Sequence, residues 1–121
     1  MNEILYKYGN HVNDGYMYSY IDECINDLSK LFKIITKLNN NDIFIIGYYN
    51  PTDDNELDEF IKYTNKKVID LCNKYNIDYI DTYIIFNNNK HLIYNENNYY
   101  PNQDGYKLIA NAVKNQLKLN K

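Results

Sequence analysis

The longest apolar run of the chain lies in the stretch Asp42-Ile43-Phe44-Ile45-Ile46-Gly47-Tyr48-Tyr49. Its apolar residues follow one another without alternation, so a strand built from them needs cover on both faces. Parallel strands between two layers of helices have that property. Pro51 ends the strand, because proline cannot donate to a sheet ladder. The stretch predicts a strand over residues 42–49 and an α/β architecture.

On both sides of this strand the apolar residues recur with helical spacing. The preceding helix is predicted over residues 17–38 and ends at three consecutive asparagines, 39–41. The following helix begins after Pro51, with Asp53 or Asp54 as its N-cap. Its predicted inner face comprises Leu57, Phe60, Ile61, Thr64, Val68, Leu71, Cys72 and Tyr75.

Further elements lie toward the ends of the chain. Residues 3–8 predict a short strand, residues 77–85 a third strand, and residues 87–90 a loop. The last helix is predicted over residues 103–118, with Asn102 as its cap. Its inward residues are expected to be Tyr106, Ile109, Ala112 and Val113. The alternation of strands and helices predicts right-handed crossovers and a short parallel sheet flanked by helices, in a single domain over residues 1–121.

Composition and charge exclude several classes of function. The net charge is −3, arginine is absent and the lysines are dispersed, so no nucleic-acid footprint is indicated. No apolar run is long enough to span a bilayer, and the sequence as written has no signal peptide, which predicts no membrane association and a cytoplasmic location. Cys24 and Cys72 fall on predicted apolar helix faces, which favours buried free thiols over a disulfide. Asn, Ile, Tyr and Lys make up more than half of the residues, a bias that an A/T-rich genome explains.

Two stretches carry a resemblance to a known family. They are Ile45-Ile46-Gly47-Tyr48-Tyr49-Asn50-Pro51 and the segment from Asn97 through Tyr99-Tyr100-Pro101-Asn102-Gln103-Asp104-Gly105-Tyr106 to Ala110. In order and spacing they resemble the C-terminal portion of the SGNH (GDSL-type) hydrolases, which are lipases and esterases. The resemblance implies a truncated flavodoxin-like, three-layer fold that lacks the family's first strand–helix units.

The same resemblance implies a site whose catalytic residues are missing. The family hydrolyses acyl esters with a Ser nucleophile, a His base and an orienting Asp, helped by an oxyanion hole. Here no Gly-Asp-Ser occurs, the Asp position reads Asn97 and the His position reads Tyr100. A tyrosine phenol holds its proton at neutral pH and is a poor general base. Asn13 either matches the family's oxyanion Asn or is an ordinary turn residue.

Other polar and aromatic residues are weaker candidates. His11 and His91 are isolated histidines, and a surface role explains them more simply than catalysis. A metal site is one interpretation of Asp53, Asp54, Glu56 and Asp58, but a charged first helical turn is the simpler one, so no metal or cofactor is predicted. Tyr16, Tyr18 and Tyr20 resemble a stacking platform, but mixed core and surface roles are favoured.

The sequence therefore predicts an SGNH-like protein that is inactive as an isolated chain. Parallel sheets bind ligands at the carboxyl ends of their strands, which makes Tyr48, Tyr49 and Asn50 the candidates for a ligand crevice. Two alternatives stay open: a non-catalytic acyl- or carbohydrate-binding module, and the C-terminal half of a split esterase completed by a partner chain. Residues 3–8 are expected at a sheet edge, where a homodimer or a partner strand would pair.

Overall fold

The computed structural model describes residues 14–38, 42–93 and 99–119. Over these residues the protein is a mixed α/β structure, mostly helical, with one short sheet of two parallel strands. The strand predicted at residues 3–8 lies outside the described residues. The elements in chain order are α2 (Asp14–Leu38), β1 (Phe44–Ile46), α3 (Asn55–Tyr75), β2 (Asp78–Ile80), α4 (Thr82–Asn87), the 3₁₀ helix η1 (Lys90–Leu92) and α5 (Gln103–Leu119).

The sheet pairs β1 with β2 in parallel, with Phe44 opposite Asp78. The carbonyl of Ile43 accepts a hydrogen bond from the Asp78 amide, and the Gly47 amide donates to the Ile80 carbonyl, each at 3.0 Å. The strand predicted over residues 42–49 is confirmed at its centre but is shorter. Its ladder ends at Tyr48, where the peptide groups pair with the side chain of α3 residue Asn65 instead of with a strand.

The third predicted strand is only partly correct. Residues 78–80 form β2, but the prediction of a strand is wrong for residues 82–85, which belong to α4. The carboxylate of Asp81 accepts a hydrogen bond from the Ile84 amide at 3.0 Å and caps this helix. Thr82 and Phe86, one helical turn apart, are buried, whereas Ile84 is exposed. The cap and this four-residue spacing outweigh the strand preference of the β-branched pair at 84–85.

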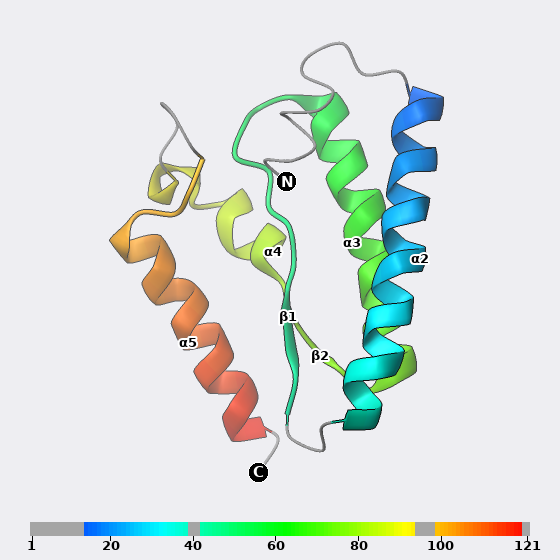
Figure 1. Cartoon of the computed structure of the whole chain (residues 1–121). Helices are drawn as coiled ribbons and strands as arrows, with labels where there is room; N and C mark the ends of the chain where they lie inside the picture. The colour runs from blue at the N-terminus through cyan, green and yellow to red at the C-terminus, as the bar shows by residue number, and fades with distance from the viewer. Residues whose placement is uncertain (1–13, 39–41, 94–98, 120–121) are drawn as a thin grey trace.

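One helical layer consists of α2 and α3, and its two apolar clusters form much of the core (Figure 1). In the first, Met17 and Ile21 of α2 pack against α3. In the second, Phe32 of α2 meets Val68 and Cys72 of α3, and side chains of both strands pack against them. Both helices therefore cover the same face of the sheet. They are confirmed close to their predicted bounds, with α2 beginning three residues earlier.

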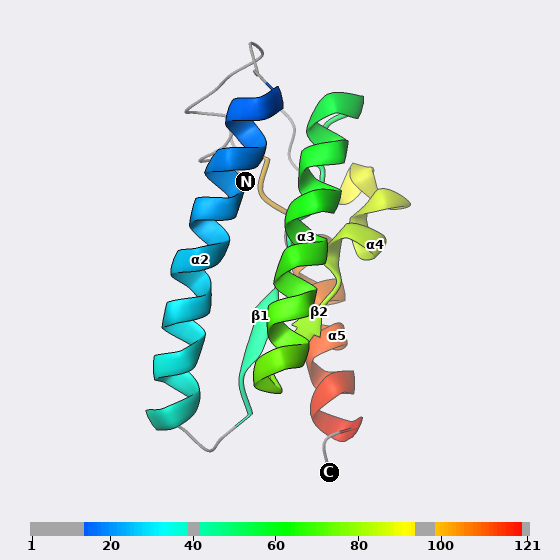
Figure 2. The same ribbon diagram turned by 90° about the vertical axis from the view of Figure 1, so that its right-hand side faces the viewer.

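The opposite face of the sheet is covered by α5, as Figures 1 and 2 show together. The predicted cap is confirmed, because the Asn102 side-chain oxygen accepts a hydrogen bond from the Gly105 amide at 2.9 Å. Only Gly105 is fully buried in this helix. Tyr106, predicted to face inward, is instead 54% exposed. The main neighbours of α5 are β2, α4 and η1, a surface too narrow to cover its whole apolar side.

Two further expectations about burial are wrong. Ile46 was expected to be covered, but it is 54% exposed because β1 lies at an edge of the described sheet. Cys24 was expected to be buried, but it is exposed, whereas Cys72 is buried as predicted. The side of α2 that bears Cys24 turns away from α3. Both cysteines are free thiols.

Candidate functional site

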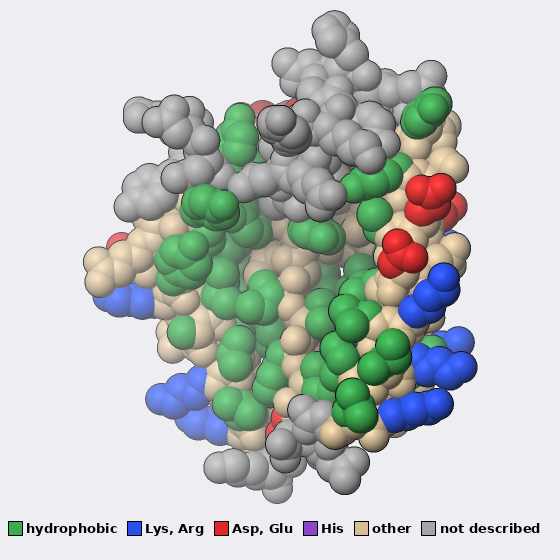
Figure 3. Space-filling model, in the orientation of Figure 1, with side chains coloured by type: hydrophobic (Ala, Val, Ile, Leu, Met, Phe, Trp, Pro, Cys, Tyr) green, Lys and Arg blue, Asp and Glu red, His purple; other side chains and the backbone are tan. Residues whose placement is uncertain are grey.

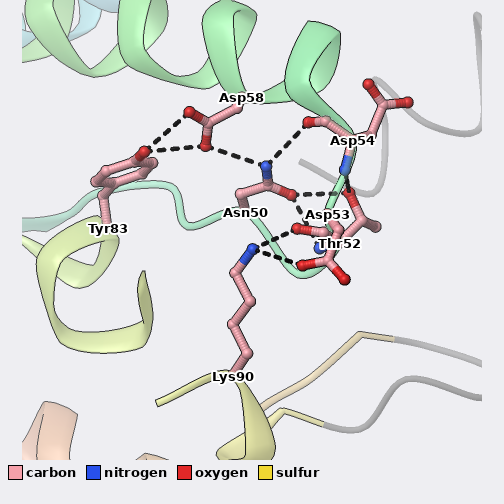
Figure 4. A network of polar contacts seen from close by, with 7 residues as sticks. All are labelled: Asn50, Thr52, Asp53, Asp54, Asp58, Tyr83 and Lys90. Atoms are coloured by element: carbon pink, nitrogen blue, oxygen red, sulfur yellow. Dashed lines mark hydrogen bonds and ion pairs between the residues drawn. The ribbon is translucent and has the colours of Figure 1, made fainter. Parts of the chain in front are cut away.

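The turn that follows β1 is held by a network of polar side chains at the carboxyl end of the sheet (Figure 4). Its centre is Asn50, which is only 5% exposed. The side-chain oxygen of Asn50 accepts hydrogen bonds from the amide and the hydroxyl of Thr52, both at 2.9 Å. Its side-chain nitrogen donates to the Asp54 carbonyl at 3.3 Å and to the Asp58 carboxylate at 3.1 Å. The crevice candidate Asn50 thus uses both ends of its amide to fix the turn onto α3.

Asp58 is the second junction of this network. The hydroxyl of Tyr83 donates to both carboxylate oxygens, at 2.9 and 3.0 Å, and Lys62 forms an ion pair with the carboxylate at 3.2 Å. Burial alone would raise the pKa of Asp58, but the hydrogen bonds from Asn50, Tyr83 and Lys62 outweigh it and hold the pKa below its usual value. The carboxylate is therefore a charged anchor that joins α3 to α4.

The remaining acidic residues of this helix start have structural partners. Asp54 is the N-cap of α3, because its carboxylate accepts hydrogen bonds from the amides of Glu56 and Leu57. Asp53 pairs with Lys90, whose ammonium group also donates to the Thr52 carbonyl at 2.6 Å. Across the described ranges, no three His, Cys, Asp or Glu side chains gather as a metal site would require. These contacts match the interpretation as a charged first turn.

Tyr49 connects the exit of β1 to the segment that precedes α5. Its hydroxyl donates to the carbonyl of Tyr99 at 2.7 Å, and its ring packs on Phe86 with the centroids 4.8 Å apart. Burial, followed by the charges of Tyr106 and Tyr100, raises the pKa of Tyr49 to about 12. The bond to the Tyr99 carbonyl places the Tyr49 phenol next to the residue that precedes Tyr100. The structure therefore brings Tyr49, a residue that the sequence singled out, to the segment that carries Tyr100.

Tyr48 lies on the same turn but does not share the burial of Asn50. Its side chain is exposed, and its peptide amide and carbonyl pair with the side chain of Asn65 at 3.0 and 2.8 Å. Tyr100 is 51% exposed. The carboxyl end of the sheet therefore presents the exposed phenols of Tyr48 and Tyr100 beside the half-buried Tyr49. Aromatic faces of this kind suit contact with acyl chains or with sugar rings.

The other candidates from the sequence do not join this cluster. Asn97, Asn13 and His11 lie outside the described residues. His91 is exposed on η1, and its backbone carbonyl accepts a hydrogen bond from the Asn102 side chain at 3.3 Å. Ser19 and Ser29, the only serines of the chain, lie on α2. Among the described residues, no hydrogen bond joins either serine to His91.

Two features of this region were missed by sequence reasoning. Tyr83 was assigned to a strand, so its bond to Asp58 could not be foreseen. The second is Tyr79, whose hydroxyl is buried without a hydrogen-bond partner. This hydroxyl occupies the space that a side chain on Gly47 would fill. The hydroxyl of Thr82 donates to the Gly47 carbonyl beside it. The glycine after the apolar run was the available signal, because a glycine in a strand often marks a close approach.

A surface pocket of about 220 Å³ adjoins the network on the α3 side. It is lined by Lys62, Asn65, Lys66, Ile69 and Asp70 of α3, and by Asp81 and Tyr83 at the start of α4. None of the predicted crevice residues lines it. Tyr83 and Lys62 connect it to Asp58, so the pocket and the turn share the same anchoring carboxylate.

Comparisons with known proteins give no relative. A scan against protein-family models finds no match, and searches of the curated proteins and of the solved structures find none either. Among the helices that the structure describes, none is both long and apolar enough to cross a membrane. Function must therefore be argued from the geometry of this chain.

Proposed function

We propose that the chain is an SGNH-type hydrolase-like domain, of truncated flavodoxin-like fold, that does not hydrolyse esters by itself. The observation that carries the proposal is the bond between the Tyr49 hydroxyl and the Tyr99 carbonyl. It holds the start of α5 beside the exit of β1, where the resemblance puts the family's histidine loop. The residue at the histidine position is Tyr100, which cannot act as the base. The order of parallel strands and crossover helices further supports the proposal.

An esterase assay tests this proposal. Purified chain should hydrolyse p-nitrophenyl acetate no faster than an unrelated protein of the same size, because among the described residues no hydrogen bond joins a serine to a histidine. The Ser19→Ala variant should be indistinguishable from the parent chain. Turnover by the parent that disappears in Ser19→Ala would contradict the proposal, since a nucleophile would then be present.

A repair experiment separates this proposal from the split-esterase alternative. The double variant Asn97→Asp with Tyr100→His restores the acid and base residues of the family but supplies no nucleophilic serine. Because the members of a triad act as a unit, the variant should stay inactive. Activity that appears only after a Gly-Asp-Ser-bearing chain is added would favour a split enzyme. Activity of the variant by itself would show that a serine of this chain serves as the nucleophile and would contradict the proposal.

A second candidate function is a non-catalytic acyl- or carbohydrate-binding module. Exposed phenols beside the exit of β1 favour it, because Tyr100 follows the Tyr99 carbonyl that Tyr49 binds and Tyr106 lies in the first turn of α5. Tyr100→Ala should then weaken the binding of octanoate or of a short oligosaccharide measured by calorimetry. Tyr16→Ala is a suitable control, since Tyr16 is more exposed and lies on α2. Equal loss in both variants, or no binding by the parent, would speak against this function.

A further inference from the structure

The edge of β1 that faces away from β2 carries no strand within the described residues. Ile43 and Gly47 direct their peptide groups at β2, as their hydrogen bonds to Asp78 and Ile80 show. Successive residues of a strand direct their peptide groups to opposite edges. Phe44 and Ile46 therefore present their amides and carbonyls to the open edge, where a further strand can pair.

Apolar side chains flank this edge. Figure 3, in the orientation of Figure 1, shows hydrophobic side chains gathered over β1 and over the adjoining parts of α2 and α5, with most of the charges at the borders. The large apolar side chains that these three elements expose include Leu31, Ile34 and Leu38 on α2, Ile46 on β1, and Tyr106 and Leu117 on α5. The three on α2 are spaced by three and four residues and so share one side of the helix. An extended segment with apolar residues would cover such a surface.

The handedness of the crossovers decides which side of β1 the preceding strand occupies. The chain runs from β1 through α3 to β2, and α2, which leads into β1, packs in the same layer as α3. Strand–helix–strand crossovers between parallel strands are right-handed in nearly all proteins. Two right-handed crossovers with their helices on the same face step across the sheet in the same direction. A parallel strand that precedes α2 would therefore lie beside β1 on the side away from β2.

We propose that residues 3–8 of this chain, Glu3-Ile4-Leu5-Tyr6-Lys7-Tyr8, occupy this open edge as a third parallel strand. In a strand the side chains alternate, so Ile4, Tyr6 and Tyr8 would lie on one face and Leu5 on the other, between Glu3 and Lys7. Residues 9–13 connect it to Asp14, where α2 begins, and five residues is an ordinary length for such a loop. Lys7 then protects the new outer edge from further pairing.

The inference does not rest on the proposed function, because it uses only the open edge, its apolar flanks and the crossover rule.

Residue-resolved amide exchange on the intact chain tests the proposal. The amides of Phe44 and Ile46 should exchange about as slowly as that of Gly47, which is bonded to Ile80. Leu5→Pro and Tyr6→Pro each remove one peptide donor. Because successive residues direct their amides to opposite edges, only one of these two variants removes a donor that faces β1. In that variant the amides of Phe44 and Ile46 should exchange about tenfold faster or more, with Gly47 little changed. Asn2→Pro, just before the strand, is the matched control and should change neither.

The opposite outcomes are equally clear. Fast exchange of Phe44 and Ile46 in the intact chain would overturn the proposal. So would protection that rises with protein concentration together with a doubled mass in light scattering, because a second copy would then be the occupant. Nuclear Overhauser contacts between residues 4–7 and 44–46 in the intact, monomeric chain give the same decision without any variant. Their absence would also overturn it.

Discussion

Asp58 is the residue whose charge does most to fasten the turn after β1. Asn50, Tyr83 and Lys62 all direct hydrogen-bond donors at its carboxylate. Because these contacts lower its pKa in the folded state, the ionised form is bound more tightly than the protonated one. The resulting stability is present above the pKa of the unfolded chain, about 4, and is lost as the pH falls through the lower pKa of the folded state.

The Asp58→Asn variant tests this linkage. We expect its free energy of unfolding at pH 7 to fall by about 1 kcal/mol, since a charged acceptor is lost at a site that water partly screens. The difference from the parent chain should shrink as the pH falls below the pKa of the unfolded chain and through the lowered pKa of the native carboxyl. Urea unfolding followed by circular dichroism between pH 2 and pH 7 measures both effects.

Glu59→Gln is the matched control for that experiment. Glu59 lies next to Asp58 on α3 and contacts the same Lys62, but only at 4.0 Å, and its side chain is 68% exposed. Its removal should change the free energy of unfolding little at any pH. If both variants show the same pH profile, general charge on α3, and not the anchored carboxylate, explains the effect.

The acidic cluster also shows how far single residues can be predicted from sequence. The pattern Asp53-Asp54-Asn55-Glu56 predicted a helix start, because carboxylates are favourable there. The choice of Asp54 over Asp53 as the cap depends on backbone geometry that the pattern does not contain. The role of Asp58 was not predictable at all, since its partners Asn50 and Tyr83 come from elements brought together only by folding.

For elements, the junction between α5 and the segment before it depends on a close approach at Gly105. A Cβ atom on this residue would lie 2.7 Å from the Leu92 carbonyl oxygen and 2.9 Å from the Cβ of Pro101. The first contact involves backbone and the second a proline ring, and neither yields easily. The glycine therefore allows the first turn of α5 to pack against η1.

Gly105→Ala tests this junction. Helix propensity alone would favour alanine by about 1 kcal/mol. We expect instead a loss of about 1–3 kcal/mol, because the added methyl group overpacks a contact that cannot relax. Thermal or urea unfolding measures the change. Ala110→Gly, at an exposed position of the same helix, is the control, because it measures the difference in helix propensity between alanine and glycine without a packing contact. A Gly105→Ala protein that is more stable than the parent would contradict the proposed close packing.

The elements were predicted unevenly, for a physical reason. The helices α2, α3 and α5 were foreseen because their apolar spacing extends over four or more turns. The short helix α4 was mistaken for strand, since Tyr83-Ile84-Ile85 has strand-forming composition. In six residues the helical period hardly repeats, and the cap from Asp81 decides the conformation.

In the whole molecule, the two helical layers are held to the sheet with different strength. Seven residues of α3 are buried, namely Leu57, Phe60, Ile61, Thr64, Asn65, Val68 and Cys72, whereas α5 buries only Gly105 completely. Regions with few buried contacts open at a lower free energy than the rest of a protein. The layer containing α5 is therefore the less stable of the two.

Native-state hydrogen exchange measures this asymmetry directly. Amides in the middle of α5 should exchange through an opening that costs less free energy than the one that exposes the middle of α3. Low concentrations of urea should accelerate amide exchange more steeply in α3 than in α5, because the opening of α3 exposes more surface. Identical opening free energies for both helices would show instead that the described chain unfolds as one cooperative unit.

The general arrangement of the molecule could be predicted from the sequence, but the completeness of the cover over the sheet could not. The alternation of strand and helix predicted a parallel sheet between helices, and β1, β2 and their flanking layers have that arrangement. The prediction that Ile46 is covered is wrong. An apolar pattern indicates that a strand must be buried on both faces, but it does not indicate which segment buries it. The candidate site was predicted in part: Tyr49 binds the segment that carries Tyr100, whereas Asn50 holds the turn.

The unequal burial of the two cysteines makes their thiols chemically different. Burial, together with the charge of Asp78, raises the pKa of the Cys72 thiol to about 11, so it stays protonated and inert inside the folded chain. Cys24 faces solvent and meets oxidants freely. In air, chains would therefore join through Cys24 as disulfide-linked pairs that a reductant separates. Such a disulfide-linked pair would have the mass of a dimer. A non-covalent dimer can be told apart from it because its mass does not change when dithiothreitol is added.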